Sequence, residues 1–140
     1  MTGAALPLQV WSQIEPDEGI DYETLRTPIP TASFGQIEVL EFFRYGCPFC
    51  NAMESFLTRW KPGLAADVAL RKVPVSFYST THQQLYLTLV QLGEEARLGP
   101  RVFDTIHRQG RSLEMLMEIS EWASQHGIDV ARFEAAWHSP

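Results

Sequence analysis

The sequence is poor in cysteine, in positive charge and in long apolar runs. Cys47 and Cys50 are the only cysteines among 140 residues, and the two residues between them make too short a loop for a structural staple. Lysine and arginine number 11 against 17 aspartate and glutamate, a net charge of −6, which argues against a protein that follows nucleic-acid phosphates. No apolar run approaches the ~20 residues that span a bilayer.

The first ten residues, MTGAALPLQV, also lack the basic segment and long apolar run of a secretory signal. We therefore expect either a protein that stays inside the cell or one whose leader has been replaced by a Met. With 45% hydrophobic and 20% charged residues, the chain has the composition of one globular domain.

The pattern around the cysteines predicts a strand, a helix and a second strand. The apolar run at residues 36–43 predicts a central strand covered on both faces. Gly46 ends this strand, Pro48 suits the first position of a helix, and Pro62 stops that helix. Residues 67–78 return to strand character, so the cysteines lie where a strand meets its crossover helix. The apolar stripe of this helix is expected in the core and consists of Met53, Phe56, Leu57 and Trp60.

Outside this segment, short extended pieces are expected at residues 7–11 and 22–25. From about residue 80 the pattern is helical. Four helices are expected, over residues 80–93, 100–110, 113–127 and 129–137. A capping box is expected where Thr80 or Thr81 precedes a glutamine by three residues.

A C-x-x-C pair at the start of a helix predicts redox chemistry. Cys47 faces unpaired N–H groups and the positive end of the helix dipole, which favour its thiolate. We expect Cys47 to be the exposed nucleophile and Cys50 the more buried resolving thiol, with Pro48 keeping the sulfurs in bonding range. Two alternatives stay open: a pair of unreactive buried thiols, and half of a zinc site.

The zinc site would need two histidines that only tertiary folding brings together. None has zinc-finger spacing, and each is expected at the surface or at a helix cap: His82, His107, His126 and His138.

The stretches VLEFFRYGCPFC, KVPVSF and EISEWASQHGIDVARFEAAW resemble the DsbA family of bacterial thiol-disulfide oxidoreductases. The resemblance implies an α/β fold, with a thioredoxin-like βαβ portion at residues 1–78. A helical insertion domain and the start of the following helix would occupy residues 79–140. The resemblance also implies that the closing ββα part of the thioredoxin fold, with its cis-proline segment, is missing after Trp137. Three explanations of such an incomplete sheet stay open: a truncation, two chains that complete each other through the unpaired strand edge, or a rearranged packing around the helices.

The resemblance further implies a periplasmic enzyme that introduces disulfide bonds into exported, unfolded proteins. Its partners would be cysteine-containing polypeptides and a quinone-linked membrane protein of the DsbB type, and no cofactor, metal or nucleic acid is expected. Glu41 matches the family's acidic residue behind the disulfide, and Lys72 matches a basic neighbour. Glu41 could move the Cys50 proton, or it could simply form a salt bridge with Lys72. Glu54 is expected to be solvated.

Two other functions stay open at this point. One is an interaction module whose incomplete active site is idle, and the other is a thioredoxin-like reductase or isomerase. Fast alkylation at pH 6 would indicate a reactive Cys47 rather than an idle one.

Phe49 stands where the family often has histidine, and it cannot stabilise a thiolate, although Arg44 can compensate partly. We therefore predict that Phe49→His lowers the pKa of Cys47 and makes the protein a stronger oxidant. Each pKa unit corresponds to ~1.4 kcal/mol and to ~30 mV for a two-electron couple. Thiolate absorbance of both proteins checks this, and an unchanged or raised pKa in the variant would contradict it.

Overall fold

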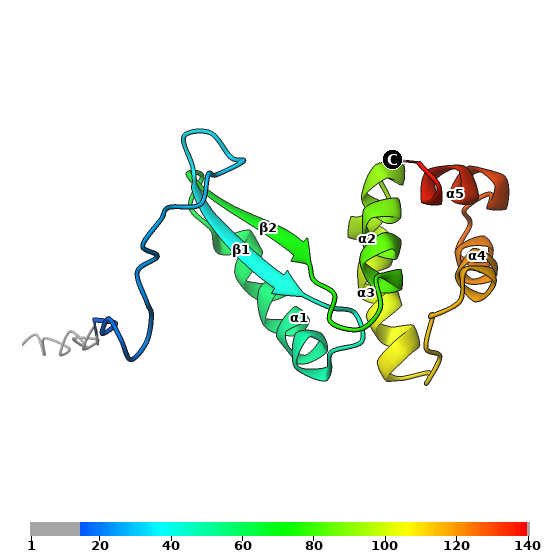
Figure 1. Cartoon of the computed structure of the whole chain (residues 1–140), viewed down its shortest axis with the longest axis horizontal. Helices are drawn as coiled ribbons and strands as arrows, with labels where there is room; N and C mark the ends of the chain where they lie inside the picture. Colours follow the sequence, from blue (N-terminus) through cyan, green and yellow to red (C-terminus); the bar gives the residue numbers. More distant parts are fainter. Residues whose placement is uncertain (1–14, 140) are drawn as a thin grey trace, which may run out of the picture. The chain divides into compact units, whose positions relative to one another are not determined.

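The computed structural model describes residues 15–139, which form two compact units, one up to Thr31 and one from Ala32 (Figure 1). In the first unit the Gly19 N–H donates to the Tyr22 carbonyl at 2.7 Å and closes a local turn. Residues 23–25 form no strand, so the extended piece expected at 22–25 is reduced to this turn. The piece expected at residues 7–11 lies outside the described residues. All elements below belong to the second unit.

The strand, helix and strand around the cysteines are confirmed. Strand β1 (Ile37–Phe43) pairs in parallel with β2 (Val68–Pro74), and α1 (Pro48–Trp60) followed by the short 3-10 helix η1 (Lys61–Gly63) connects them. The register places Glu41 beside Lys72, on one face of the sheet. The second strand ends at Pro74 rather than at residue 78, and the Val75 N–H still donates to the Phe43 carbonyl at 2.9 Å.

Two expectations about burial are wrong within the described residues. Phe42, on the face of β1 opposite Glu41, is 58% exposed, so this strand is not covered on both faces. On α1, Met53, Phe56 and Trp60 recur at helical spacing but are 49%, 59% and 45% exposed. The period of an apolar stripe predicts a helix, whereas its burial depends on what packs against it.

The helical region begins near residue 80, as expected. Its members are α2 (Thr81–Leu92), α3 (Glu95–His107), α4 (Leu116–Gln125) and α5 (Val130–Trp137). Helix α3 begins before Pro100 and contains it as its sixth residue, although an interior proline cannot donate to the carbonyl four residues earlier. Helix α4 begins later than expected, since Leu113 has a φ of 51° and is not helical. The capping box is not formed, because the Thr80 side chain makes no cap bond.

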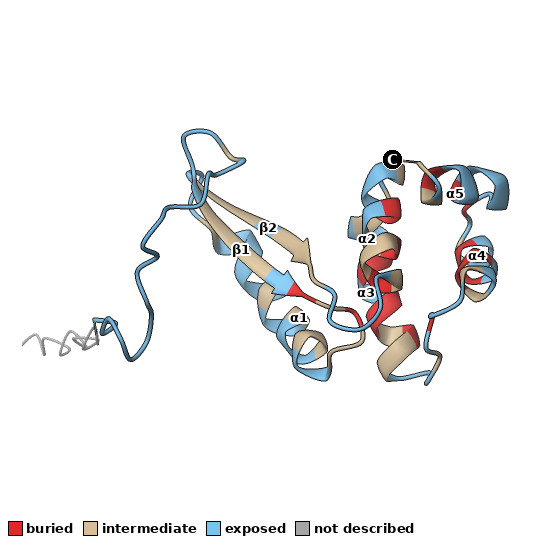
Figure 2. Cartoon of the chain, viewed as in Figure 1, coloured by how far each residue is buried: buried red, intermediate tan, exposed pale blue. Residues whose placement is uncertain are grey.

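The core lies among the helices and reaches the end of β1 (Figure 2). Trp122 and Phe133 are fully buried, and the Trp122 indole N–H donates to the Thr105 hydroxyl at 2.9 Å. Phe43 and Tyr45, which end β1 and start the loop to Cys47, are part of the same core. Met117 was expected there as well, but it is exposed.

Helices α2 to α5 carry the apolar residues of the predicted insertion, and the boundary between residues 78 and 79 stays a prediction. No helix between residues 15 and 139 is long and apolar enough to cross a membrane.

Asp129 caps the last helix, since its carboxylate accepts from the Arg132 N–H at 2.9 Å. We predict that Asp129→Ala lowers the free energy of unfolding by about 1 kcal/mol, the usual effect of losing such a cap. Asp129→Asn keeps an acceptor and should lose much less. Urea unfolding of the three proteins measures this, and equal losses in both variants would contradict the capping role.

Candidate active site

The two cysteines lie where the sheet and the helices meet, as the sequence predicts. Cys47 is the N-cap residue of α1, with extended backbone angles (φ −92°, ψ 119°), and Pro48 occupies the first turn. Both thiols are free and half-buried. Cys50 packs against the hydrophobic core, one turn after Cys47. This places a thiol pair at the start of a helix with its second member toward the protein interior.

The surroundings shift the pKa values of the two thiols in opposite directions. The backbone N–H of Cys50 lowers the pKa of Cys47 most, and the Cys50 thiol, the Phe49 N–H and the Arg44 charge lower it further. Burial raises the pKa of Cys50, and the charge of Glu41 adds to that effect. Cys47 is therefore the better nucleophile and leaving group, and Cys50 holds its proton more firmly.

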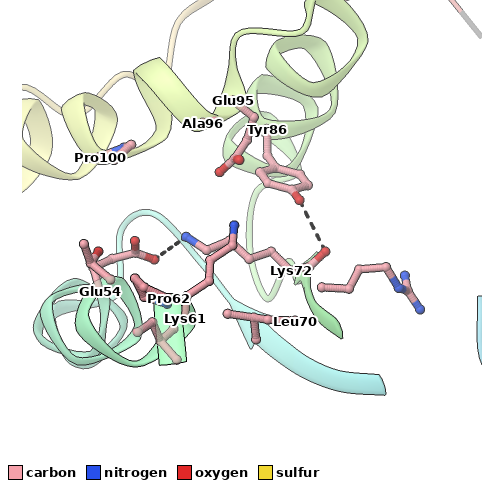
Figure 3. A pocket seen from close by; sticks show the side chains of 12 residues that line it. Glu54, Lys61, Pro62, Leu70, Lys72, Tyr86, Glu95, Ala96 and Pro100 are labelled. Carbon is pink, nitrogen blue, oxygen red and sulfur yellow. Dashed lines mark hydrogen bonds and ion pairs between the residues drawn. The ribbon is translucent and has the colours of Figure 1, made fainter. Parts of the chain in front are cut away.

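Behind Cys50, one cation lies between two carboxylates. The Lys72 ammonium forms its closer ion pair with Glu54 (Figure 3). The same ammonium lies 3.9 Å from a Glu41 oxygen. Glu54 was expected to be solvated, but its side chain is only 16% exposed, because α1 turns this residue toward β2. Lys72 also lies over the rings of Phe43 and Phe103, at 5.2 and 5.8 Å from their centroids.

Of Glu41, Glu54 and Lys72, Glu41 has the least complete hydrogen bonding. One of its carboxylate oxygens is buried without a hydrogen-bond partner. Burial raises the pKa of Glu41, while the charge of Lys72 lowers it. The group is therefore biased toward holding a proton near Cys50. That the pair serves proton transfer rather than a plain salt bridge stays a proposal.

A cavity of about 430 Å³ opens beside the Lys72–Glu54 pair. It lies between α1, β2, α2 and α3, and the Tyr86 hydroxyl at its wall donates to the Lys72 carbonyl at 3.3 Å (Figure 3). Its lining comes from segments far apart in the sequence, so no local pattern indicates it. Leu57, Leu70 and Pro100 supply apolar surface, and Glu95 adds a carboxylate.

Two of the four histidines depart from the expected surface or cap positions, whereas His138 is the exposed C-cap of α5, as expected. His126 is the C-cap of α4, as expected, but His82 is 8% exposed. His107 is half-buried and bonds to the backbone just before Cys47. Within residues 15–139 no group of three or more His, Cys, Asp or Glu side chains is arranged to hold a metal ion. Sequence reasoning missed His82 and His107 because only the packing of α2 and α3 against β1 brings them to the site.

No family model matches the chain. The thiol:disulfide interchange protein DsbA of Azotobacter vinelandii is 40% identical over 123 residues, which are 86% of this chain and 58% of that protein. The crystal structure of Pseudomonas aeruginosa DsbA is 34% identical, with a TM-score of 0.76 over 82% of this chain and 61% of that one. A structure of oxidised PaDsbA1 is 32% identical, with a TM-score of 0.81 over 89% of this chain and 67% of that one. The chain belongs to the DsbA family.

Membership of the DsbA family confirms the predicted fold class, a thioredoxin-like βαβ portion followed by helices. The described residues contribute a two-stranded parallel sheet and five α-helices to it. The chain spans 58% of the A. vinelandii DsbA that it matches.

Because burial raises the pKa of Glu41 above its ordinary value of 4.5, the folded protein prefers this carboxyl in the neutral form. Its contribution to stability is therefore favourable below pH 4.5 and is lost as the pH rises through the raised value. We predict that Glu41→Gln stabilises the reduced protein at pH 7 by on the order of 1 kcal/mol, the scale of a single substitution. The gain should vanish as the pH falls below about 4.5.

Urea unfolding from pH 3.5 to 8 measures this difference. Glu38→Gln is the matched control on the same strand, because Arg71 lowers the pKa of Glu38 and the substitution should therefore destabilise at pH 7. A Glu41→Gln variant that is less stable than the wild type at pH 7 would contradict the expected sign.

Proposed function

We propose that this DsbA-family chain catalyses thiol-disulfide exchange and introduces disulfide bonds into exported, unfolded proteins. The observation that carries the proposal is the opposite perturbation of two neighbouring thiols. The pKa of Cys47 is lowered at the start of α1, and that of Cys50 is raised by burial. The names of its relatives support the same chemistry, since the A. vinelandii protein is a thiol:disulfide interchange protein.

The reaction begins with the Cys47–Cys50 disulfide. A substrate thiolate attacks the Cys47 sulfur, the bond between the two cysteines breaks, and the Cys50 sulfur takes up a proton. A second substrate thiolate then attacks the substrate sulfur of this mixed disulfide and releases Cys47 as a thiolate. The substrate has lost two electrons and two protons, and the enzyme pair has gained the electrons. The lowered pKa of Cys47 makes the second step fast, because an acidic thiol is a good leaving group.

The neighbouring residues have assigned roles in this proposal. Pro48 begins the helix that places Cys50 one turn from Cys47. Phe49 offers only its backbone N–H to the thiolate, so Arg44 is the nearby side chain whose charge lowers the pKa of Cys47. Glu41 supplies or accepts the Cys50 proton, and Lys72 balances its charge.

The proposed substrates are polypeptides with exposed cysteines, and the proposed compartment is the periplasm, because a disulfide donor works only in an oxidising space. The reduced pair must return its two electrons to another molecule. We assign this step to a membrane quinone reductase of the DsbB type, as the family resemblance implies.

The exposed apolar side chains favour a second candidate, an interaction module. Phe42, Phe56 and Trp60 present apolar surface on the sheet and on α1. The paired strands form a two-stranded sheet in the described part of the chain, and the outer edge of β1 offers backbone groups to another strand. Self-association through this edge is the proposed form of that interaction.

We predict that Cys47→Ser abolishes oxidative refolding of a reduced substrate, because the attacked sulfur is removed. With a substrate that already contains a disulfide, Cys50→Ser should instead accumulate a mixed disulfide. The Cys47 thiolate attacks the substrate disulfide and releases one substrate thiolate, and no Cys50 thiol is left to resolve the new bond. Gel mobility under non-reducing conditions detects the trapped species.

A Cys47→Ser protein that refolds substrate like the wild type would overturn the proposal that the chain is an enzyme. Slow alkylation of Cys47 at pH 6 would favour the interaction module. A strongly reducing equilibrium against glutathione would instead favour a reductase or isomerase.

A further inference from the structure

A tight turn carries the chain from β1 to Cys47. The Arg44 carbonyl accepts from the Cys47 N–H at 3.1 Å, which closes a β-turn over Tyr45 and Gly46. The central peptide of that turn joins Tyr45 to Gly46. Its carbonyl, on Tyr45, takes no part in the bond that closes the turn, so its orientation depends on other partners.

A histidine from the helical region holds this carbonyl. His107 is the last residue of α3, and its Nε2 lies 2.7 Å from the Tyr45 carbonyl oxygen. Because a carbonyl can only accept, Nε2 carries the hydrogen and donates it. The ring of Phe103 stacks on the imidazole, with centroids 6.1 Å apart and planes at 23°. The imidazole is thus held in place for this bond.

A second histidine stands against the other half of the same peptide. Two ring atoms of His82 lie 3.4 Å from the point that a Cβ on Gly46 would occupy. The His82 Nε2–H donates to the Ser112 carbonyl at 2.9 Å, and a Glu114 oxygen lies 3.6 Å from the same nitrogen. The loop between α3 and α4 therefore anchors this ring as a wall beside Gly46.

We propose that His107 and His82 are positioning residues for the redox pair: they hold the Tyr45–Gly46 peptide in one orientation and keep Cys47 at the start of α1. The proposal rests on the proposed function in treating Cys47 as the reacting thiol. Neither histidine touches the reacting sulfur in this role, and both act through the backbone of the turn.

The turn itself does not impose this orientation. The central peptide of a β-turn has two common orientations, type I and type II, and type II requires a positive φ at the third residue. Gly46 occupies that place and tolerates a positive φ, yet it is not among the glycines that adopt one. The His107 bond and the His82 ring supply the preference that the turn sequence lacks.

The orientation matters because Cys47 directly follows the turn. Its thiolate is stabilised by the N–H groups of Cys50 and Phe49, and it reaches them only while Cys47 keeps its N-cap conformation. A turn that alternates between two forms would leave the sulfur over these donors for less of the time. The reduced form would then be less stable, and the protein would be a weaker oxidant.

The test compares His107→Leu, which keeps the bulk but removes the donor, with His107→Gln, which restores an uncharged N–H donor. We expect His107→Leu to raise the pKa of Cys47 and to lower the equilibrium constant for oxidising glutathione about two- to tenfold, the range for one lost hydrogen bond. His107→Gln should recover most of that change. His82→Ala should shift both quantities in the same direction.

His126→Leu is the matched control. It removes a histidine that bonds to the Trp122 carbonyl at 2.7 Å within α4, so it weakens the helical region without touching the turn. We expect it to lower the free energy of unfolding and to leave the glutathione equilibrium unchanged. Equal shifts in His107→Leu and His126→Leu would overturn the proposal, and so would equal values for His107→Leu and His107→Gln. An unchanged equilibrium in His82→Ala would overturn the part assigned to His82.

These measurements need only the thiols of the protein and glutathione, and they involve no protein substrate. A shift in His107→Leu therefore supports the positioning role even if the wild type fails to oxidise a substrate. A protein that oxidises substrate but shows no shift would instead retain the proposed function and lose this inference.

Discussion

The structure depends on the insertion of the end of β1 into the helical core. Phe43 and Tyr45 are both 1% exposed, and their rings meet edge to face at 5.2 Å. The ring of Tyr45 also packs against that of Phe103 in α3, with centroids 5.0 Å apart. The ring of Phe43 packs against that of Tyr86 in α2, with centroids 5.1 Å apart. These aromatic contacts fix the point from which α1 starts, because only Gly46 and Cys47 separate Tyr45 from Pro48. The position of the thiols is thus set by a core to which the helical region contributes most.

In the same contact region the two thiols have different electrostatic surroundings. Cys47 lies at the helix end that offers N–H groups, so its charge is accommodated by the backbone. Cys50 lies toward the core, where burial raises the pKa of Glu41 and Lys72 is shared between Glu41 and Glu54. A single cation cannot fully balance two carboxylates in a poorly hydrated place, so the carboxylate farther from the ammonium is biased toward protonation. The charges of Cys47 and Glu41 both act on Cys50, so this thiol has an ionising thiol and a carboxyl biased toward protonation as its neighbours.

The sequence predicts correctly those features of the structure that depend on a few neighbouring residues. The strand before Cys47 and the helix start at Pro48 were predicted from the sequence, and so were the helix ends at Gly93 and Gly127, because each reflects an intrinsic backbone preference. The wrong predictions concern features that depend on contacts between segments distant in the sequence. Leu113 adopts a left-handed conformation while its side chain is fully buried, so tertiary packing overrides its preference for a helix. Burial of the α1 stripe and the site positions of His82 and His107 likewise depend on elements remote in sequence.

Phe49 connects these observations. The residue between the cysteines supplies no side-chain donor, so the thiolate depends on the backbone N–H groups of Phe49 and Cys50 and on the Arg44 charge. Backbone donors stabilise a charge only in a fixed direction, whereas a flexible charged side chain can follow a moving sulfur. A site that relies on the backbone is therefore more sensitive to the geometry of the preceding turn. In this chain the turn is held from outside, by helices α2 and α3, and the redox properties of CPFC become a property of how the helical region packs on β1.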